Sequence, residues 1–368
     1  MGLNVLIQAE TMQDLTAEIF VAAGCSAEEA ACIGRRLVMA NLTGHDSHGV
    51  IRVPRYLQWM RDGTLVPGQT IEIVTESESF AVVDGRHGFG QSVGTQAVEL
   101  GIAKAKKNGV AIVALRNAGH LGRIGDWAEM AVEAGLISIH FVNVAGSLLV
   151  APFGGTERRM STNPICIGVP LEDGPPLILD FATALVAEGK VLVAASGGKA
   201  LPPGALIGPD GVPNADPKTL YGAGDIHDPQ GGRQGLGAIR TMGEHKGSGL
   251  ALMCEMLAGA LTGSGCAGPA KRRIANGMLS IYLSIEALSG DGGHAFGAEA
   301  RAYVDFFTSA RPVEPDGEVL VPGEPERRRR AARLAEGLEL PAQVWGDILA
   351  AAKTVGLEPA AIEARIAG

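Results

Sequence analysis

The sequence predicts a mixed α/β fold that runs through three consecutive regions. Apolar residues recur at helical spacing between residues 8 and 41, and helical patterning returns between residues 325 and 366. Between these two parts, short apolar runs that end at glycine turns alternate with helical segments, which is typical of strands covered by helices. A chain of 368 residues also exceeds one ordinary core. We therefore expect a helical region at 1–70, a central α/β region at 71–310 and a C-terminal segment at 311–368.

Composition restricts the classes of partner and the cellular location. Hydrophobic residues make up 46% of the chain against 19% charged residues, so a sizeable buried core is expected. The net charge of -9 disfavours nucleic acid and anionic membranes as partners, although local Arg and His side chains can still form a positive pocket. The five cysteines form no CxxC pair, the N-terminus lacks a secretory leader, and no run approaches the roughly 20 apolar residues of a membrane helix. These features predict a cytoplasmic protein with reduced thiols.

The first 70 residues are expected to be helical apart from one polar loop. The first predicted helix covers residues 8–23. Ser26 followed by Glu29 matches a capping box, which begins a second helix at 27–41. The sequence HDSH follows between two glycines, so we place it in the loop after the second helix.

The segment after this loop carries three chemically active side chains at intervals of four residues. His48, Arg52 and Tyr56 lie on one stripe if the segment is helical. An imidazole can transfer a proton, a guanidinium can hold a carboxylate, and a phenol can hydrogen-bond an oxygen. Pro54 would bend or restart such a helix. We interpret the stripe as the substrate and proton half of a hydride-transfer site, for which a dinucleotide supplies the other half.

Simpler explanations exist for each of these side chains. A single histidine in a loop is often structural, and Arg52 could belong to a surface ion pair. His45 and His48 also have the spacing of two metal ligands, but no third cluster with cysteine or carboxylate spacing lies nearby. We therefore expect no metal site and favour the catalytic interpretation.

The central region opens with strands at 71–84, a helix at 92–107 and a strand at 110–115. A GxGxxxG sequence begins at Gly88, between strand and helix, where a Rossmann phosphate loop would lie. Its spacing is one residue longer than the usual fingerprint, and the next strand ends in Arg116 rather than in an acid. We therefore assign these glycines to backbone geometry and not to a phosphate site.

A second candidate site follows the strand at 110–115. His120 lies at the carboxyl end of this strand, and Gly122 to Ile124 precede a helix that ends near Gly135. Free N–H groups at the start of that helix, together with Arg123, predict an anion or pyrophosphate site. The remaining predicted elements are strands at 136–143, 165–170, 177–182 and 276–285, and helices at 250–261 and 298–310.

Six motifs in order carry a resemblance to a known family. They are HDSHG with the following Arg and PRY, then GHLGRIG, STNP, LDFATA, GEHKG and PGEPE. Together they resemble the malate/L-lactate dehydrogenase family, which are NAD(P)-dependent reductases of 2-oxo acids with a fold unrelated to the Rossmann enzymes. The resemblance runs from about residue 8 to the C-terminal helices. The motifs GHDSHG, SIHFVNV and APFGG are similar to those of the hydroxycarboxylate dehydrogenase and hydroxyphenylpyruvate reductase branch.

This resemblance implies a fold, a homodimer and roles for individual residues. The fold is non-Rossmann mixed α/β of the L-sulfolactate/malate dehydrogenase type, with a helical region built from both chain ends. His48 matches the proton donor, while Ser47, Arg52, Tyr56 and His120 match residues that line the substrate pocket. NAD is the implied cofactor and NADP is possible. The cofactor would be held by His48, Gly122, Arg123, Ile124, Thr162, Asn163, Pro164, Ile178, Leu179, Asp180, Phe181, Ala182, His245, Lys246, Asn276, Gly323, Glu324, Pro325 and Glu326.

The sequence departs from the family pattern at two places. Ala184 stands where many members carry serine, which removes one hydroxyl near the cofactor. The stretch 197–237 is dense in glycine and proline, so we expect mostly loop, laid over the surface or over a neighbouring subunit. Its later part, 221–240, looks longer than in relatives. The size of the substrate therefore does not follow from the resemblance.

The expected reaction is hydride transfer to the carbonyl carbon of a 2-oxo acid, with His48 donating the proton and Arg52 holding the carboxylate. Reduction of a cyclic imine carboxylate of the piperideine-2-carboxylate type is an alternative. A non-catalytic ligand-binding relative is a third reading. Asp180 either contacts the cofactor or caps a turn, and His120 either contacts substrate or nicotinamide or bonds its own loop. The sequence leaves NAD against NADP and the identity of the oxo acid open.

Overall fold

A seven-stranded mixed sheet forms the centre of the molecule in the computed structural model, which describes residues 4–195, 199–223, 233–270, 273–290 and 292–367. Every neighbouring pair of strands is antiparallel except β3 and β4, which are parallel. The mixed α/β prediction is confirmed. In sheet order the strands are β2 (Glu72–Glu76), β3 (Phe80–Asp84), β4 (Val110–Ala118), β11 (Ala275–Ser284), β5 (Leu136–Ala145), β6 (Pro164–Val169) and β7 (Leu177–Ala182).

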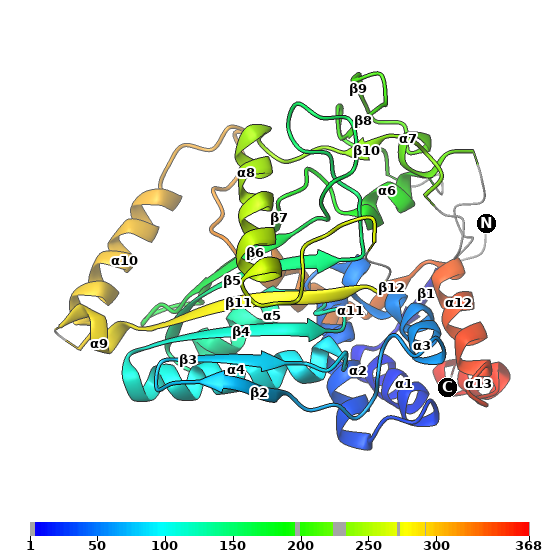
Figure 1. The fold of residues 1–368 in the computed structure, drawn as a ribbon, viewed down its shortest axis with the longest axis horizontal. Helices are drawn as coiled ribbons and strands as arrows, with labels where there is room; N and C mark the ends of the chain where they lie inside the picture. The colour runs from blue at the N-terminus through cyan, green and yellow to red at the C-terminus, as the bar shows by residue number, and fades with distance from the viewer. Residues whose placement is uncertain (1–3, 196–198, 224–232, 271–272, 291, 368) are drawn as a thin grey trace.

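Helices cover both faces of this sheet. On one face, α4 (Gly90–Asn108) and α5 (Gly125–Glu133) enclose a core that includes Trp127 and Tyr282. On the other face, α8 (His245–Cys254) and the π-helical turn η3 (Glu255–Ala260) lie against β5 and β11 (Figure 1). Successive residues of β11 face opposite sides of the sheet. Met278 belongs to the core under α4 and α5, whereas Gly277 lies against the Ala258 backbone of η3.

The two ends of the chain share a second apolar core at one end of the sheet. It contains buried residues of five helices, among them Phe20, Leu37, Leu57 and Trp345. Strand β1 (Val5–Ile7) pairs antiparallel with β12 (Leu338–Leu340), and both strands contribute buried side chains to this core. Helix α11 (Glu324–Glu336) contacts α2. The helical region from both chain ends is therefore confirmed. The five helices are α1 (Ala9–Ala22), α2 (Ala27–Leu42), α3 (Val53–Arg61), α12 (Ala342–Lys353) and α13 (Pro359–Ala367).

A third, smaller apolar core lies beside the loop regions above β7. Its members include Leu206, Leu220 and Ile239 from the Gly/Pro-rich connection, packed with Leu149 and Val191. The connection is largely irregular, as expected, but its buried side chains were not anticipated; residues 196–198 and 224–232 lie outside the described residues. The short elements here are α6 (Glu188–Ala195), β8 (Leu206–Ile207), β9 (Pro213–Asn214), α7 (Lys218–Tyr221) and β10 (Ala238–Ile239).

One arm of the molecule projects away from all three cores. It consists of α9 (Ile285–Ser289) and α10 (His294–Thr308), which leave the far end of β11 (Figure 1). No described residue of α10 is buried, and Tyr303 and Phe306 are 64% and 74% exposed. Such exposed aromatic rings on one helix are unusual for an isolated soluble chain.

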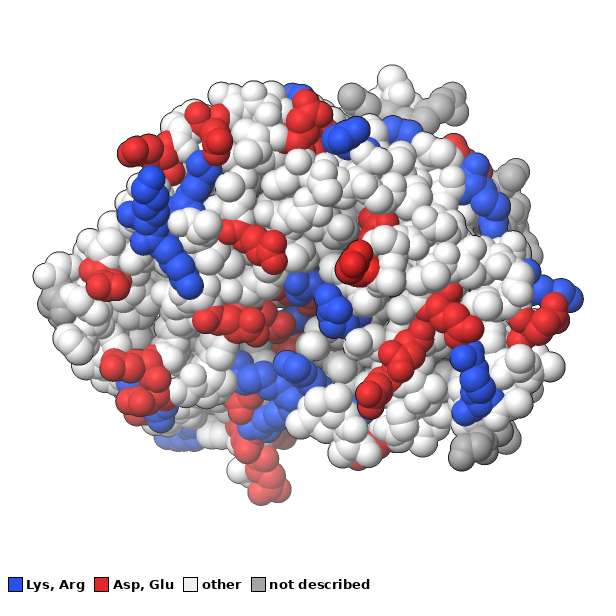
Figure 2. Space-filling model, turned by 90° about the horizontal axis from the view of Figure 1, so that it is seen from below, with Lys and Arg blue, Asp and Glu red and all other residues white. Residues whose placement is uncertain are grey.

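Acidic and basic side chains both occur on the face seen in Figure 2, in groups separated by uncharged surface. The ion pairs of the described residues include i,i+4 pairs on helices, such as Arg328 with Glu324 on α11 and Arg301 with Asp305 on α10. None of the helices in the described part of the chain has the length and hydropathy needed to cross a membrane.

Candidate active site

The HDSH segment forms a rigid loop because Asn41, at the end of α2, bonds to both of its ends. The Asn41 Oδ1 accepts from the Val50 N–H at 2.8 Å, and its Nδ2 donates to the Asp46 carboxylate at 2.8 Å. A side chain on Gly49 would collide with the Asn41 amide, so this close approach requires glycine. The loop contains two short 3₁₀ turns, η1 (Asp46–His48) and η2 (Val50–Arg52), and then leads directly into α3.

The expected restart at Pro54 is confirmed, because α3 begins at Val53 with Pro54 in its first turn, and a further break lies earlier, at Gly49. The chain is extended at Gly49, between the two 3₁₀ turns, while Pro54 lies in the first turn of α3. Proline is tolerated at that position because its missing N–H would have no partner in the helix. His48, Arg52 and Tyr56 therefore follow one another along two short turns and a helix, not along one continuous helix.

Two histidine rings from distant parts of the sequence stack in this region. His120 follows β4, and its ring lies 5.2 Å from that of His48 at an interplanar angle of 14°. The His48 Nδ1 is 3.3 Å from the His120 Nε2, and the His120 Nδ1 is 2.7 Å from the Tyr56 hydroxyl. The Gln91 amide of α4 in turn donates to the Tyr56 oxygen at 2.9 Å. One connected polar chain thus runs from a buried glutamine to His48.

Arg52 is oriented by the loop that carries His48. Its Nε donates to the Ser47 carbonyl at 2.6 Å, while its two terminal nitrogens form no hydrogen bond within the described residues. Ser47 is itself packed against α6, since a Cβ added to Gly189 would lie 2.5 Å from the Ser47 Cβ. The guanidinium is therefore held at one edge and free to bind an anion at the other.

These side chains line one cavity of about 470 Å³. Ser47, His48, Arg52 and His120 all contribute to its wall, and Tyr56 lies buried behind His120. The wall is completed by apolar and polar side chains of several elements, including Trp59, Val144, Leu149, Ser161, Thr162 and Leu192. The cavity combines an apolar lining with a few directed polar groups, which is the composition of small-molecule sites.

Burial keeps both histidines neutral. It lowers the pKa of His48 to about 3, and the nearby positive charges of Arg52 and His45 act in the same direction. Burial likewise lowers the pKa of His120 well below its ordinary value. The Tyr56 hydroxyl is buried too, which raises its pKa to about 12. His48 at neutral pH is therefore an imidazole that can accept a proton.

Three of the segments expected to hold a dinucleotide lie side by side at the start of α5. The Gly125 N–H donates to the Asp180 carboxylate of β7 at 2.7 Å, and the Ile178 N–H donates to the Pro322 carbonyl at 3.2 Å. Gly323 has a φ of +88°, and a Cβ there would lie 3.1 Å from the Ile178 nitrogen. Asp180 therefore caps a helix, one of the two roles considered for it, and the segments 122–125, 178–182 and 322–326 form one neighbourhood.

The prediction of an anion site built on the Arg123 guanidinium is wrong. This side chain is 2% exposed and ion-paired with Asp126 at 2.9 Å and with Glu129 at 2.8 Å. These two carboxylates raise the pKa of Arg123 despite its burial. The Gly125 N–H group at the start of α5 already donates to Asp180. An anion would meet a carboxylate here, whereas ribose hydroxyls could donate to it.

The other residues expected at the cofactor are scattered. Asn276 is buried, where its Oδ1 accepts from the Leu121 N–H and its Nδ2 donates to the Asn143 carbonyl, so it positions the loop that carries His120. Thr162 lines the cavity with His48, whereas the Asn163 amide donates to the buried Glu255 and Pro164 begins β6.

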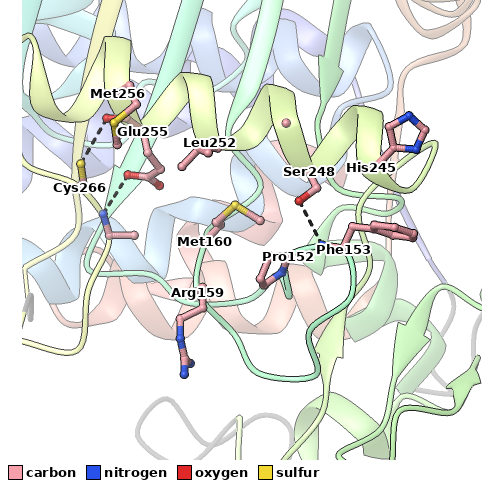
Figure 3. A pocket seen from close by; sticks show the side chains of 12 residues that line it. Pro152, Phe153, Arg159, Met160, His245, Ser248, Leu252, Glu255, Met256 and Cys266 are labelled. Carbon is pink, nitrogen blue, oxygen red and sulfur yellow. Dashed lines mark hydrogen bonds between the residues drawn. The ribbon is translucent and has the colours of Figure 1, made fainter.

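His245 and Lys246 begin α8, and the structure does not bring them to the His48 cavity. His245 instead lines a second cavity of about 570 Å³ together with Phe153 and Leu252 (Figure 3). This second cavity is mainly apolar, and Phe153 and Leu252 are about half exposed. Among the described residues, no three His, Cys, Asp or Glu side chains converge as metal ligands would.

The family of the chain follows from comparison with known proteins. The model of the malate/L-lactate dehydrogenase family matches residues 7–349. The chain belongs to this family. Within the malate/L-lactate dehydrogenase family, hydroxycarboxylate dehydrogenase B of Escherichia coli strain K12 is 37% identical over 361 residues, which cover 97% of this chain and 96% of that protein.

Solved structures of the malate/L-lactate dehydrogenase family share the fold along the whole chain. An E. coli structure described as a malate/lactate dehydrogenase has a TM-score of 0.90 at 35% identity and covers 99% of this chain and 100% of that chain. The sulfolactate dehydrogenase of Methanocaldococcus jannaschii has a TM-score of 0.83 at 33% identity and covers 97% and 99% respectively. The predicted non-Rossmann fold is therefore confirmed.

Several residues in or beside the His48 cavity were missed in the sequence. Gln91 lies within the glycine-rich HGFGQ stretch, and its contact with Tyr56 joins two distant segments. Glu188, Tyr221 and Arg233 reach the cavity from α6 and from the Gly/Pro-rich connection. Arg55 stands beside Arg52 in the PRY motif, where its spacing of three from Arg52 was a usable signal.

Proposed function

We propose that this protein is an NAD(P)-dependent oxidoreductase that interconverts a 2-oxo acid and the corresponding 2-hydroxy acid. The observation that carries the proposal is the shared cavity, where the Arg52 guanidinium and the stacked imidazoles of His48 and His120 face the same space. A 2-oxo acid places a carboxylate next to a carbonyl, so a cation and a proton-transferring group at one site match its two functional groups. The family's members named as dehydrogenases of lactate, malate and sulfolactate support this assignment.

The residues around α5 fit a dinucleotide. Gly323 lets the chain pass close to β7, where any side chain would press on the Ile178 backbone, and the carboxylates of Asp180 and Glu326 can accept from ribose hydroxyls. His45 lies in the same electrostatic environment as these two carboxylates. The segments 122–124, 178–182 and 323–326 would hold the cofactor, and when bound it supplies the hydride.

The protein's own part is to bind the acid and move one proton. Arg52 holds the substrate carboxylate and thereby fixes the carbonyl carbon in the cavity. In the oxidative direction the neutral His48 accepts the hydroxyl proton, which its lowered pKa allows at physiological pH. In the reductive direction the substrate carboxylate offsets the positive charge of Arg52, and protonated His48 donates to the developing alkoxide. His120 and Tyr56 hold the His48 ring in place through the Nδ1 contact.

A substrate panel tests this proposal. NADH and NADPH oxidation would be followed with pyruvate, oxaloacetate, phenylpyruvate and a cyclic imine carboxylate. The proposed function predicts turnover of at least one 2-oxo acid, and His48→Ala should reduce its kcat by about 10²–10⁴-fold, the usual worth of general acid catalysis. Cofactor binding, measured by nicotinamide fluorescence, should be kept in the variant. Turnover of the imine alone would assign the protein to imine reduction, and cofactor binding without any turnover would make it a ligand-binding relative.

We further infer a cytoplasmic homodimer. All five cysteines are free thiols in the structure, which fits a reducing compartment. Two exposed apolar residues of α8 and η3, Leu252 and Met256, line the second cavity. The exposed aromatic residues of α10 form another apolar surface. Burial of such surfaces against a second copy removes apolar area from water.

A further inference from the structure

Positive charge gathers at the edge of the His48 cavity beyond what one carboxylate needs. Among the residues that the structure describes, three arginines line this cavity, namely Arg52, Arg55 and Arg233, against one acidic side chain, Glu188. The chain as a whole carries a net charge of -9. A cluster of like charges inside an acidic protein costs free energy unless an anion binds to it.

Arg55 is placed for such an anion by the helix that carries Arg52. Both residues have helical backbone conformation, and residues three apart on a helix lie next to one another. Arg55 forms no ion pair in the part of the chain that the structure describes. Burial and the positive charges of Arg52 and Arg233 lower the pKa of Arg55, and the opposing effect of Glu188 does not offset them.

Arg233 is built into the opposite rim by two sets of contacts. Its guanidinium makes a two-pronged contact with the Glu188 carboxylate, at 2.5 and 2.7 Å. Its carbonyl accepts from Arg158, whose guanidinium also donates to the carbonyls of Leu220 and Gly237. Arg158 thereby holds the segments before and after Arg233 close to each other through hydrogen bonds to their backbone carbonyls. The Arg233 side chain is 37% exposed, so it lies at the mouth of the cavity and not in its depth.

We propose that Arg55 and Arg233 form a second anion subsite, which selects 2-oxo and 2-hydroxy acids that carry a further acidic group on the side chain. This inference rests on the proposed function, in which Arg52 takes the carboxylate beside the reacting carbon. The second group, a carboxylate or a sulfonate, would lie between Arg55 and Arg233 and accept from both. Glu188 keeps Arg233 at the rim until the anion arrives. Arg55 and Arg233 are thus specificity-determining residues for this reaction.

The experiment compares matched acids that differ only in the second acidic group. Oxaloacetate is paired with 2-oxobutyrate, and 2-oxoglutarate with 2-oxopentanoate, so that a methyl group replaces the second carboxylate. The kcat/KM ratio of diacid to monoacid should be on the order of tenfold to a hundredfold for at least one pair, as charge-assisted hydrogen bonds provide. A sulfonated 2-oxo acid in a further arm distinguishes a sulfonate from a carboxylate.

Two variants assign this preference to residues. Arg55→Gln and Arg233→Gln should each reduce the diacid-to-monoacid ratio by about tenfold or more. Arg61→Gln is the matched control, since Arg61 lies on the same helix, bonds Gln58 and Thr354, and does not line the cavity. The diacid-to-monoacid kcat/KM ratio of Arg61→Gln should equal that of the unchanged protein.

The two proposals fail in different ways. If no 2-oxo acid, pyruvate and phenylpyruvate included, is turned over with NADH or NADPH, the proposed function itself fails. If the monoacids or phenylpyruvate are used as well as the diacids, the proposed function stands and the second subsite is overturned. A diacid preference that survives both arginine variants would also overturn the assignment. The comparison of matched acids in the unchanged protein needs no variant, so poor folding of either variant leaves the proposal testable.

Discussion

The protonation state of the His48 imidazole decides whether it can accept or donate a proton. In the free protein its pKa is lowered to about 3, first by burial and then by Arg52 and His45. An ordinary histidine titrates near ~6.5, so it would change charge in the physiological range. The neutral form of His48 therefore dominates throughout that range. Oxidation of the hydroxy acid requires this neutral form, which can accept the hydroxyl proton. The reductive direction depends on a minor protonated population.

This difference predicts opposite pH profiles for the two directions. Oxidation needs neutral His48, so its kcat/KM should stay flat from about pH 8 to about pH 5 instead of falling below ~6.5. Reduction needs protonated His48, so its kcat/KM should rise about tenfold for each pH unit lowered over the same range. Steady-state kinetics in both directions measure this. A break near ~6.5 in both profiles would contradict the lowered pKa.

Close packing around α4 explains the glycines that resemble a phosphate loop. A Cβ on Gly94 would lie 2.8 Å from the Trp127 ring, and one on Gly90 would press on the His120 carbonyl. Gly90 therefore brings α4 directly against the loop that holds the second histidine. Gly94 allows α4 to approach the Trp127 ring, and Gly90 allows it to approach the His120 loop. These contacts agree with the assignment of the glycines to backbone geometry instead of phosphate binding.

A pair of glycine substitutions tests this packing role. Gly94→Ala should destabilise the protein by about 1–3 kcal/mol, because the Trp127 ring must shift to admit a methyl group. Gly346→Ala in α12 is the control, since nothing lies within 4 Å of its Cβ position. That change should be neutral or stabilise by up to about 1 kcal/mol, because alanine favours the helix. Urea unfolding measures the change in the free energy of unfolding for each variant. Equal unfolding midpoints for the two variants would contradict the packing account.

Elements with a long periodic pattern could be predicted from the sequence, while contacts between distant segments could not. Helices α1 and α2 and the central strands follow from apolar spacing and from the Ser26 cap, whose hydroxyl accepts from the Glu29 N–H. The pairing of β1 with β12 was missed because each strand has three residues, too few to show the alternation of apolar and polar side chains that marks a strand. Glu29 binds the Gly68 N–H instead of closing the capping box, a partner that only the fold supplies.

The same limit applies to the site. His48, Arg52 and Tyr56 were identifiable because their spacing and chemistry are local. His120 meets them only through the close packing of α4 beneath its loop, and Gln91 only through its contact with Tyr56. The ion pairs of Arg123 and the separate cavity of His245 depend on side-chain positions that no motif encodes. The division into regions at 1–70, 71–310 and 311–368 stays a prediction.

At the level of the whole molecule, the α9–α10 arm predicts association. Phe306 on α10 is 74% exposed, and no described residue of that helix is buried within the chain. Light scattering should therefore give twice the chain mass, and Phe306→Glu should shift it toward the monomer because a charge would replace an apolar contact. Glu299→Gln on the same helix is the control and should leave the mass unchanged. A native protein of single-chain mass would contradict the homodimer.

In the proposed function, the fold as a whole joins a substrate half from the N-terminal loop to a cofactor half around α5. The reaction proposed for this cavity is transfer of a hydride to the carbonyl carbon, with the proton supplied by His48. Reduced NAD that carries deuterium at the transferable position gives the most direct test, with the product examined by NMR. The account predicts a 2-hydroxy acid with deuterium on the carbon that bore the oxo group, and loss of this product in His48→Ala. A product without deuterium at that carbon, or full turnover in His48→Ala, would contradict it.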